Sequence, residues 1–150
     1  MGSDPIDGCI ERWHAHLRGE LEGGFDAILH PDCVFVSPIV FTPQRGREIT
    51  KLYLLAAGTT IADADPGSSG PAIKEGGSFR YVKEVLDGHH AVLEFETTID
   101  VDGEPKYANG VDIITCDDAG MIVEFKVMIR PLQAIEAVHA QMKAMLEQLA

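Results

Sequence analysis

The sequence predicts an α+β fold in which helices come first, an antiparallel sheet follows and a last helix closes the chain. Three observations support this prediction. Apolar residues recur at helical spacing near both ends of the chain, runs typical of strands fill residues 78–130, and every turn between those runs contains glycine. Short glycine turns join consecutive antiparallel strands, and such a sheet buries its apolar face under helices.

The first half of the chain is predicted to be mostly helical. Asp4 and Pro5 provide a cap and an N1 proline for the first helix, and Gly23 and Gly24 end that stretch. The predicted elements are a helix over 5–20, a short helix over 25–30, a strand over 33–38 and a helix over about 46–57.

The second half of the chain is predicted to be four strands and a helix. The strands cover 78–86, 91–100, 106–116 and 121–130, and the helix covers 131–149. Between the two halves, residues 58–77 are rich in Gly, Pro, Ser and Asp and make an unusually long loop. Two interpretations of this loop stay open, a surface loop and a lid over a cavity.

Composition indicates one globular domain over residues 1–150, with 45% hydrophobic and 24% charged residues. The net charge of −12 argues against nucleic acid and membrane partners, because both are bound through basic patches. The apolar runs are far shorter than the roughly 20 residues that span a bilayer. Cys9, Cys33 and Cys116 form no CxxC pair, which fits a reducing, cytoplasmic compartment.

The second and fourth predicted strands each alternate between an apolar and a charged face. The apolar faces are expected to meet the helices. On the charged face, Glu94 and Glu96 could pair with Lys126 or Arg130 across strands. Two interpretations of this outer face remain open. It carries solvated ion pairs, or it forms a homodimer interface that includes Val111, Ile113 and Met128.

Asp112 is the residue on which a functional site depends most, because its strand, Val111-Asp112-Ile113-Ile114, is otherwise apolar. The carboxylate is either solvated on the outer face or held in an apolar cavity. In a cavity its pKa would rise, and it could act as an acid or a hydrogen-bond donor. Alternation alone does not place Asp112, since both faces of its strand are mixed.

Three segments have a familiar pattern: FDAILHPDCVFVSP, RGREITKLYL and GVDIITCDDAGMIVEFKVMIR. They resemble the nuclear transport factor 2-like superfamily, which includes ketosteroid isomerases and SnoaL-like polyketide cyclases. The resemblance covers roughly residues 8–145. It implies a cone-shaped, curved antiparallel sheet wrapped around three N-terminal helices, with a C-terminal helix, a pocket at the open end and frequent dimers.

The resemblance also implies roles for single residues. Asp112 falls at the protonated aspartate of the isomerase oxyanion hole, His16 at the catalytic tyrosine of that branch and Ser37 at its proton-shuttling aspartate. The match places Asp112 inside the cone with Phe95 and Phe125. A serine hydroxyl is no general base without a partner. Asp112 and His16 are therefore the predicted catalytic residues, and Ser37 is a predicted ligand contact.

The remaining predicted ligand contacts are Trp13, Tyr53 and Val127. Trp13 can also be interpreted as a core residue, and His16 as a buried, satisfied histidine. His14 and His16 point about 200° apart on a helix and so cannot chelate one metal ion. No phosphate loop or dinucleotide motif is present, and no cofactor or metal is expected.

Three functions are consistent with the sequence. The first is binding of a small, mostly apolar molecule in the cone, with isomerase, cyclase or lyase chemistry by acid–base catalysis. The second is a non-catalytic domain that binds a small molecule in the same pocket. The third is a dimeric interaction domain.

Overall fold

The structure, a computed structural model, describes residues 4–60, 79–101 and 103–149. The helices in these ranges are α1 (Pro5–Leu17), α2 (Arg47–Thr60), α3 (Leu132–Leu149) and the short 3-10 helix η1 (Gly24–Ala27). The strands are β1 (Leu29–Val36), β2 (Gln44–Arg45), β3 (Arg80–Asp87), β4 (His90–Val101), β5 (Glu104–Cys116) and β6 (Ile122–Arg130). None of these helices combines the length and the apolar character that a bilayer span requires.

The six strands form one sheet in the order β2-β1-β6-β5-β4-β3, which confirms the predicted α+β class. The meander from β3 to β6 is antiparallel throughout, as the glycine turns predict. The sheet as a whole is mixed, because β1 pairs with β6 in parallel. Local patterns describe turns between consecutive strands, and they carry no information on this long-range pairing.

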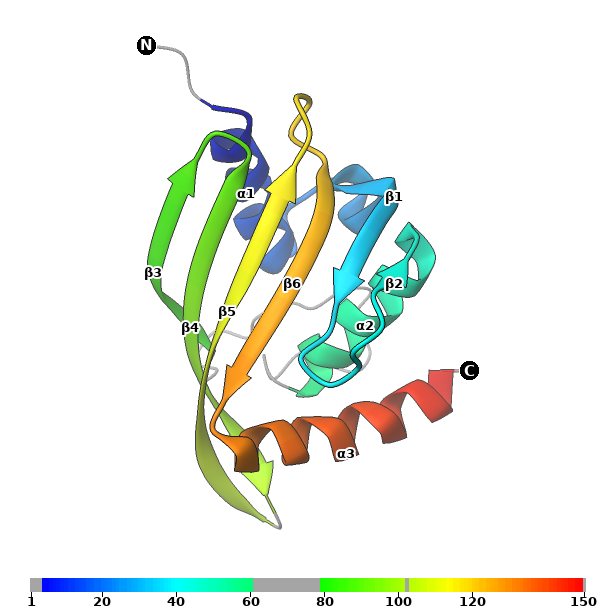
Figure 1. Cartoon of the computed structure of the whole chain (residues 1–150), viewed down its shortest axis with the longest axis vertical. Helices are drawn as coiled ribbons and strands as arrows, with labels where there is room; N and C mark the ends of the chain where they lie inside the picture. The colour runs from blue at the N-terminus through cyan, green and yellow to red at the C-terminus, as the bar shows by residue number, and fades with distance from the viewer. Residues whose placement is uncertain (1–3, 61–78, 102, 150) are drawn as a thin grey trace.

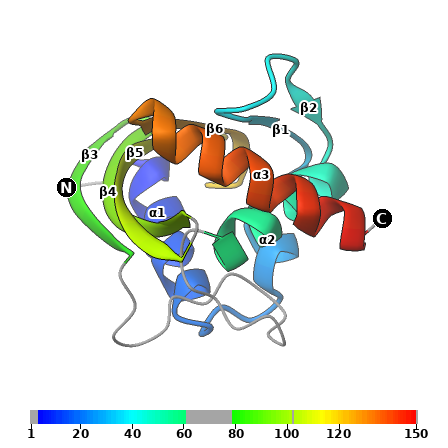
Figure 2. The ribbon, with the colours of Figure 1, turned by 90° about the horizontal axis from the view of Figure 1, so that it is seen from below.

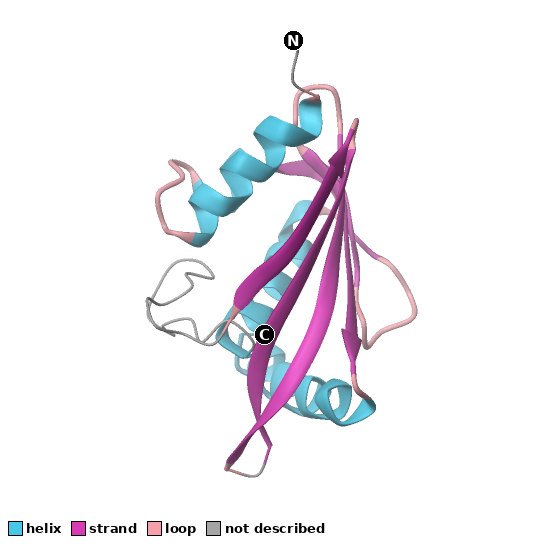
Figure 3. Ribbon diagram, turned by 90° about the vertical axis from the view of Figure 1, so that its left-hand side faces the viewer, coloured by secondary structure: helices cyan, strands magenta, loops and turns pink. Residues whose placement is uncertain are grey.

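The sheet curves around α1 and α2, while α3 crosses one end of it (Figures 1 and 2). We call the face toward α1 the inner face and the opposite one the outer face. Figure 3 shows the sheet edge-on, with α1 on one side and the connection from β1 to β2 projecting on the other. This is the curved sheet over helices that the family resemblance implies.

Most predicted elements agree with the structure to within a few residues. The predicted helix over 25–30 is wrong in extent, because β1 already begins at Leu29, where Ile122 donates a backbone hydrogen bond to Ile28. Residues 58–60 of the predicted loop belong to α2. The rest of that loop, and with it the lid hypothesis, lies outside the described residues.

The inner face carries two hydrophobic clusters. The α1 cluster lies between α1 and the sheet, and its largest members include Trp13, Phe35 and Phe125. The α3 cluster lies between α3 and the far half of the β4–β5 hairpin, and includes Phe95 and Val138. These clusters form the core that positions the candidate site.

The polar side chains of the outer face pair differently from the prediction. Arg80 pairs with Glu96, at 2.9 Å, and Asn109 donates to Glu94 while accepting from Arg130. The predicted pairing of β4 carboxylates with Lys126 or Arg130 is wrong. The reason is that β5 lies between β4 and β6, so these side chains are two strands apart.

Candidate functional site

Asp112 lies on the inner face of the sheet and is only 6% exposed. Its register partners are Leu93 on β4 and Val127 on β6. Among the described residues, Asp112 is the only Asp or Glu that is buried. The sequence left open a solvated position on the outer face, and the structure places the carboxyl among apolar side chains instead.

The carboxyl of Asp112 occupies the junction of the two hydrophobic clusters. Ile114, two residues after it, belongs to the α1 cluster, and Ala108, four residues before it, belongs to the α3 cluster. Three partly buried side chains contact both clusters, namely those of Tyr53, Tyr81 and Val127. The junction therefore consists of aromatic and aliphatic groups around one ionisable residue.

A chain of hydrogen bonds runs from α1 through β3 to β5. Trp13 donates its indole Nε1–H to the hydroxyl of Tyr81 at 3.0 Å, and Tyr81 donates its hydroxyl to Oδ2 of Asp112 at 2.5 Å. An indole nitrogen can only donate. The direction of the first bond is therefore fixed, and the phenol hydrogen, which Trp13 cannot accept, is donated to Asp112 at the end of the chain.

Burial raises the pKa of Asp112 to about 7, although the hydrogen bond from Tyr81 favours the ionised form and lowers it in part. Burial and the charge of Asp112 together raise the pKa of Tyr81 well above its ordinary value. At neutral pH the phenol of Tyr81 thus keeps its proton, whereas the carboxyl of Asp112 is present in both its neutral and its ionised form.

Aromatic rings surround this chain. The Trp13 ring lies 5.1 Å from that of Phe125, and the Tyr81 ring lies 6.4 Å from that of Phe95. On the far side of the α1 cluster, the rings of Tyr53 and Phe35 are 5.2 Å apart. The predicted contacts Trp13, Tyr53, Phe95, Phe125 and Val127 therefore lie in the two clusters that meet at Asp112, or contact them.

His16 is buried on α1, with its ring stacked 5.7 Å from Trp13 and tilted 4.3 Å from Phe25. Its Nε2 is enclosed and has no hydrogen-bond partner among the described residues. Burial lowers the pKa of His16, so the imidazole is neutral at pH 7. Trp13 stands between His16 and the Tyr81–Asp112 pair.

Ser37 follows the end of β1 and is 8% exposed. Its Oγ accepts backbone hydrogen bonds from Ile39 at 2.9 Å and Val40 at 3.3 Å, so it stabilises the turn that leaves β1. Ser37 and Val127 also line a cavity of about 240 Å³ between the ends of β1, β6 and α3. Val127, which lines this cavity, is also the register partner of Asp112.

Tyr81 is the site residue that sequence reasoning missed. A bulge in β3 places Val82 out of register between Tyr81 and Lys83, which breaks the alternation that would have assigned its face. The available signal was Phe79 and Tyr81, two aromatic residues at period two on the strand beside Phe95. Their rings lie 5.1 Å apart.

The described residues contain no group of three or more His, Cys, Asp or Glu side chains that could hold a metal ion. At the edge of the site, Nε2 of His14 contacts Oε1 of Glu84, and the His14 ring lies edge-on to Tyr81 at 5.6 Å. This pair is partly exposed and forms the solvent side of the hydrogen-bonded chain.

No family model and no curated protein matches this chain, whereas solved structures do. A steroid delta-isomerase from Pseudomonas aeruginosa is 28% identical, with a TM-score of 0.79 over 98% of this chain and 95% of that one. An uncharacterised bacterial protein with a cystatin-like fold from Silicibacter pomeroyi DSS-3 is also 28% identical, with a TM-score of 0.70 over 91% and 83%. A putative SnoaL-like polyketide cyclase from Jannaschia sp. CCS1 is 15% identical, with a TM-score of 0.63 over 93% and 98%.

These similarities extend over nearly the whole chain, which includes the curved sheet and the helices on its inner face (Figure 1). The third similarity, at 15% identity, concerns the fold alone. The chain therefore has the fold of the nuclear transport factor 2-like superfamily, as the sequence segments around His30, Gly46 and Asp112 had indicated.

Proposed function

We propose that this protein binds a small, mostly apolar molecule at the junction of its two hydrophobic clusters and moves a proton on it with Asp112. The observation that carries the proposal is the buried carboxyl of Asp112, with a pKa of about 7, among aromatic and aliphatic side chains. A carboxyl that titrates near neutral pH can both accept a proton and return it.

The chemistry that suits this site is proton transfer between two carbon atoms of a carbonyl compound, which is an isomerisation. Asp112 in its ionised form removes a proton from the carbon next to the carbonyl group, and the same carboxyl delivers it to another carbon. Because Ser37 offers no base, Asp112 performs both steps. The similarity to a steroid delta-isomerase supports a steroid or a similar cyclic, apolar compound as the substrate class.

The surrounding residues have roles that match their contacts. Trp13, Tyr53, Phe95, Phe125 and Val127 provide apolar walls for the bound molecule. Neutral His16 stacks on Trp13, and its Nε2 is enclosed, so His16 acts on the bound molecule through the position of the Trp13 ring. In addition, Ser37 is a polar contact at the cavity beside Val127.

Deuterium uptake from D2O tests the proposal. Steroid ketones and smaller cyclic ketones are incubated with the protein, and uptake next to the carbonyl group is followed by NMR. Asp112→Asn keeps the shape of the side chain but cannot accept the proton, so we expect its rate to fall at least ~100-fold. His16→Ala is expected to reduce the rate as well.

Asp118→Asn is the matched control, because the side chain of Asp118 is 98% exposed in the turn between β5 and β6. Its rate should equal that of the wild type. An undiminished rate in Asp112→Asn would contradict the proposal. Quenching of Trp13 fluorescence by a ketone that shows no exchange would favour the non-catalytic binding domain instead.

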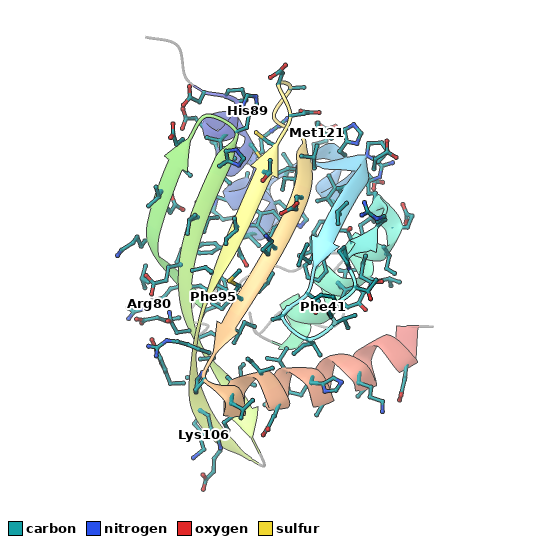
Figure 4. All side chains as sticks on the ribbon, viewed as in Figure 1. Phe41, Arg80, His89, Phe95, Lys106 and Met121 are labelled. Carbon is teal, nitrogen blue, oxygen red and sulfur yellow. The ribbon has the colours of Figure 1, made fainter. Side chains whose placement is uncertain are left out.

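We further propose that two copies of the chain associate through the outer face. Val85, Val92 and Met128 are 55%, 38% and 51% exposed there, and Val111 and Ile113 lie between them. Phe41, on the connection that projects from the same side, is 98% exposed (Figures 3 and 4). Several apolar side chains on one face of an acidic protein are typical of an interface.

A further inference from the structure

We infer that Tyr81, which accepts a hydrogen bond from Trp13, is a positioning residue. Its hydroxyl is hydrogen-bonded to Oδ2 of Asp112, so Oδ1 is the oxygen that exchanges a proton with the bound molecule. The inference rests on the proposed function of Asp112 and gives Trp13 and Tyr81 roles that neither the sequence nor the similarities assign. It follows from the direction of the hydrogen bonds between α1, β3 and β5.

The Tyr81 hydroxyl has a defined orientation. Its oxygen accepts the indole N–H of Trp13 at 3.0 Å. Because that nitrogen carries a hydrogen and no free lone pair, Trp13 cannot accept the phenol hydrogen in return. Among the described residues, the acceptor of the phenol hydrogen is Oδ2 of Asp112, at 2.5 Å.

This orientation determines which oxygen of Asp112 carries the proton in the neutral carboxyl group. In the neutral form of Asp112 one oxygen carries hydrogen, and Oδ2 already accepts the phenol hydrogen. A hydrogen on Oδ2 would point at the hydroxyl of Tyr81, whose own hydrogen would then lose its acceptor in a buried place, at considerable cost. The proton of Asp112 therefore resides on Oδ1.

Packing against neighbouring rings keeps Tyr81 in place. Its ring contacts Phe79 at 5.1 Å and Phe95 at 6.4 Å, both edge-on, and the ring of His14 lies 5.6 Å away on the helix side. The bulge after Tyr81 brings Glu84 onto the same face, where it contacts His14. Among the described residues of α1 and β3 that lie beside Tyr81, the ionisable side chains are those of His14 and Glu84.

The test uses the fact that the chain contains one tryptophan. Its indole N–H gives a single signal in a ¹H–¹⁵N spectrum, and that signal belongs to Trp13. In the wild-type protein we expect this signal to shift with pH, with a midpoint near the pKa of about 7 of Asp112. In Asp112→Asn this titration should disappear, although the signal itself remains.

Tyr81→Phe removes one oxygen and keeps the ring in its contacts. Because the lost hydrogen bond favours the ionised carboxylate, the midpoint of Asp112, followed by its ¹³C carboxyl signal, should rise by about one pH unit. The acid limb of the pH–rate profile for deuterium exchange should move with it, whereas the limiting rate at high pH changes less. Trp13→Phe weakens the same bond and should move the midpoint in the same direction.

Tyr107→Phe is the control, because Tyr107 is 51% exposed on β5 and has no part in the hydrogen-bonded chain. Its carboxyl midpoint and exchange rate should equal the wild-type values. Loss of exchange in Asp112→Asn with an unshifted midpoint in Tyr81→Phe would overturn this inference alone. Unchanged exchange in Asp112→Asn would overturn the proposed function, whatever Tyr81→Phe does.

Discussion

Asp112 couples the ionisation of one side chain to the stability of the folded chain. Its pKa of about 7 in the folded protein lies above the ordinary value of 3.8 that holds after unfolding. Between these two values the folded protein binds one more proton than the unfolded chain. Stability that depends on Asp112 is therefore lost as the pH rises from about 4 to about 7, and is constant above that range.

We expect Asp112→Asn to remove this part of the pH dependence. Between pH 5 and pH 8 the free energy of unfolding should fall by roughly 2 to 3 kcal/mol more in the wild type than in the variant. Urea denaturation at several pH values measures the difference. His16 acts in the opposite direction, because its lowered pKa costs stability as the pH falls below 6.5. Both proteins contain His16, so its contribution cancels in the difference between their free energies of unfolding. Parallel curves for the two proteins would show that Asp112 is ionised at all these pH values.

At the scale of the elements, Gly110 determines how closely β4 and β5 approach at the α3 cluster. Gly110 is the register partner of Phe95, two residues before Asp112. A Cβ on Gly110 would lie 2.5 Å from Cζ of Phe95 and 2.5 Å from the carbonyl oxygen of Met128. The missing side chain leaves room for the Phe95 ring, which lies 6.4 Å from the Tyr81 ring.

Gly110→Ala is therefore expected to lower the free energy of unfolding by about 1 to 3 kcal/mol, because the strands or the Phe95 ring must shift. Gly8→Ala is the matched control. Gly8 lies in α1, and apart from its chain neighbours and the backbone of its own helix no atom lies within 4 Å of a new Cβ, so alanine should raise stability there by about 0.5 to 1 kcal/mol. Urea denaturation of both variants checks the contrast. Equal effects of the two substitutions would contradict the steric role of Gly110.

The elements also show where prediction from sequence ends. Strand periodicity and glycine turns were sufficient for the meander, because each hairpin depends on neighbouring residues. Periodicity failed at Tyr81, where the bulge adds a residue. It also carried no information on the pairing of β1 with β6, in which Phe35 and its register partner Phe125 are far apart in the sequence. The inner position of Asp112 followed from the family resemblance, since its own strand has two mixed faces.

The molecule as a whole carries a net charge of −12, and this charge acts on the proposed dimer. Two such chains repel each other, and salt screens the repulsion within about 10 Å at 0.1 M. We therefore expect association of the wild-type protein to strengthen as salt is raised from 0.01 M to 0.2 M. Sedimentation velocity at a series of protein concentrations measures the dissociation constant at each salt concentration.

Met128→Glu places a carboxylate in the middle of the outer face and should yield monomers. Gln133→Glu adds the same charge at an exposed position on α3 and should leave association unchanged. If the wild-type protein sediments as a monomer at every salt concentration, the proposed dimer is wrong. Equal weakening by both substitutions would place the interface elsewhere.

The parallel pairing of β1 with β6 has a consequence for how the chain is made. During synthesis β1 leaves the ribosome long before β6, so its main neighbour in the sheet does not yet exist. Until β6 arrives, the apolar strand with Phe35 has only the two residues of β2 to pair with. Contacts so distant in sequence slow folding, because a long loop must close first. A nascent chain that stops before Ile122 is therefore expected to expose β1, which makes this strand the segment on which chaperones would act.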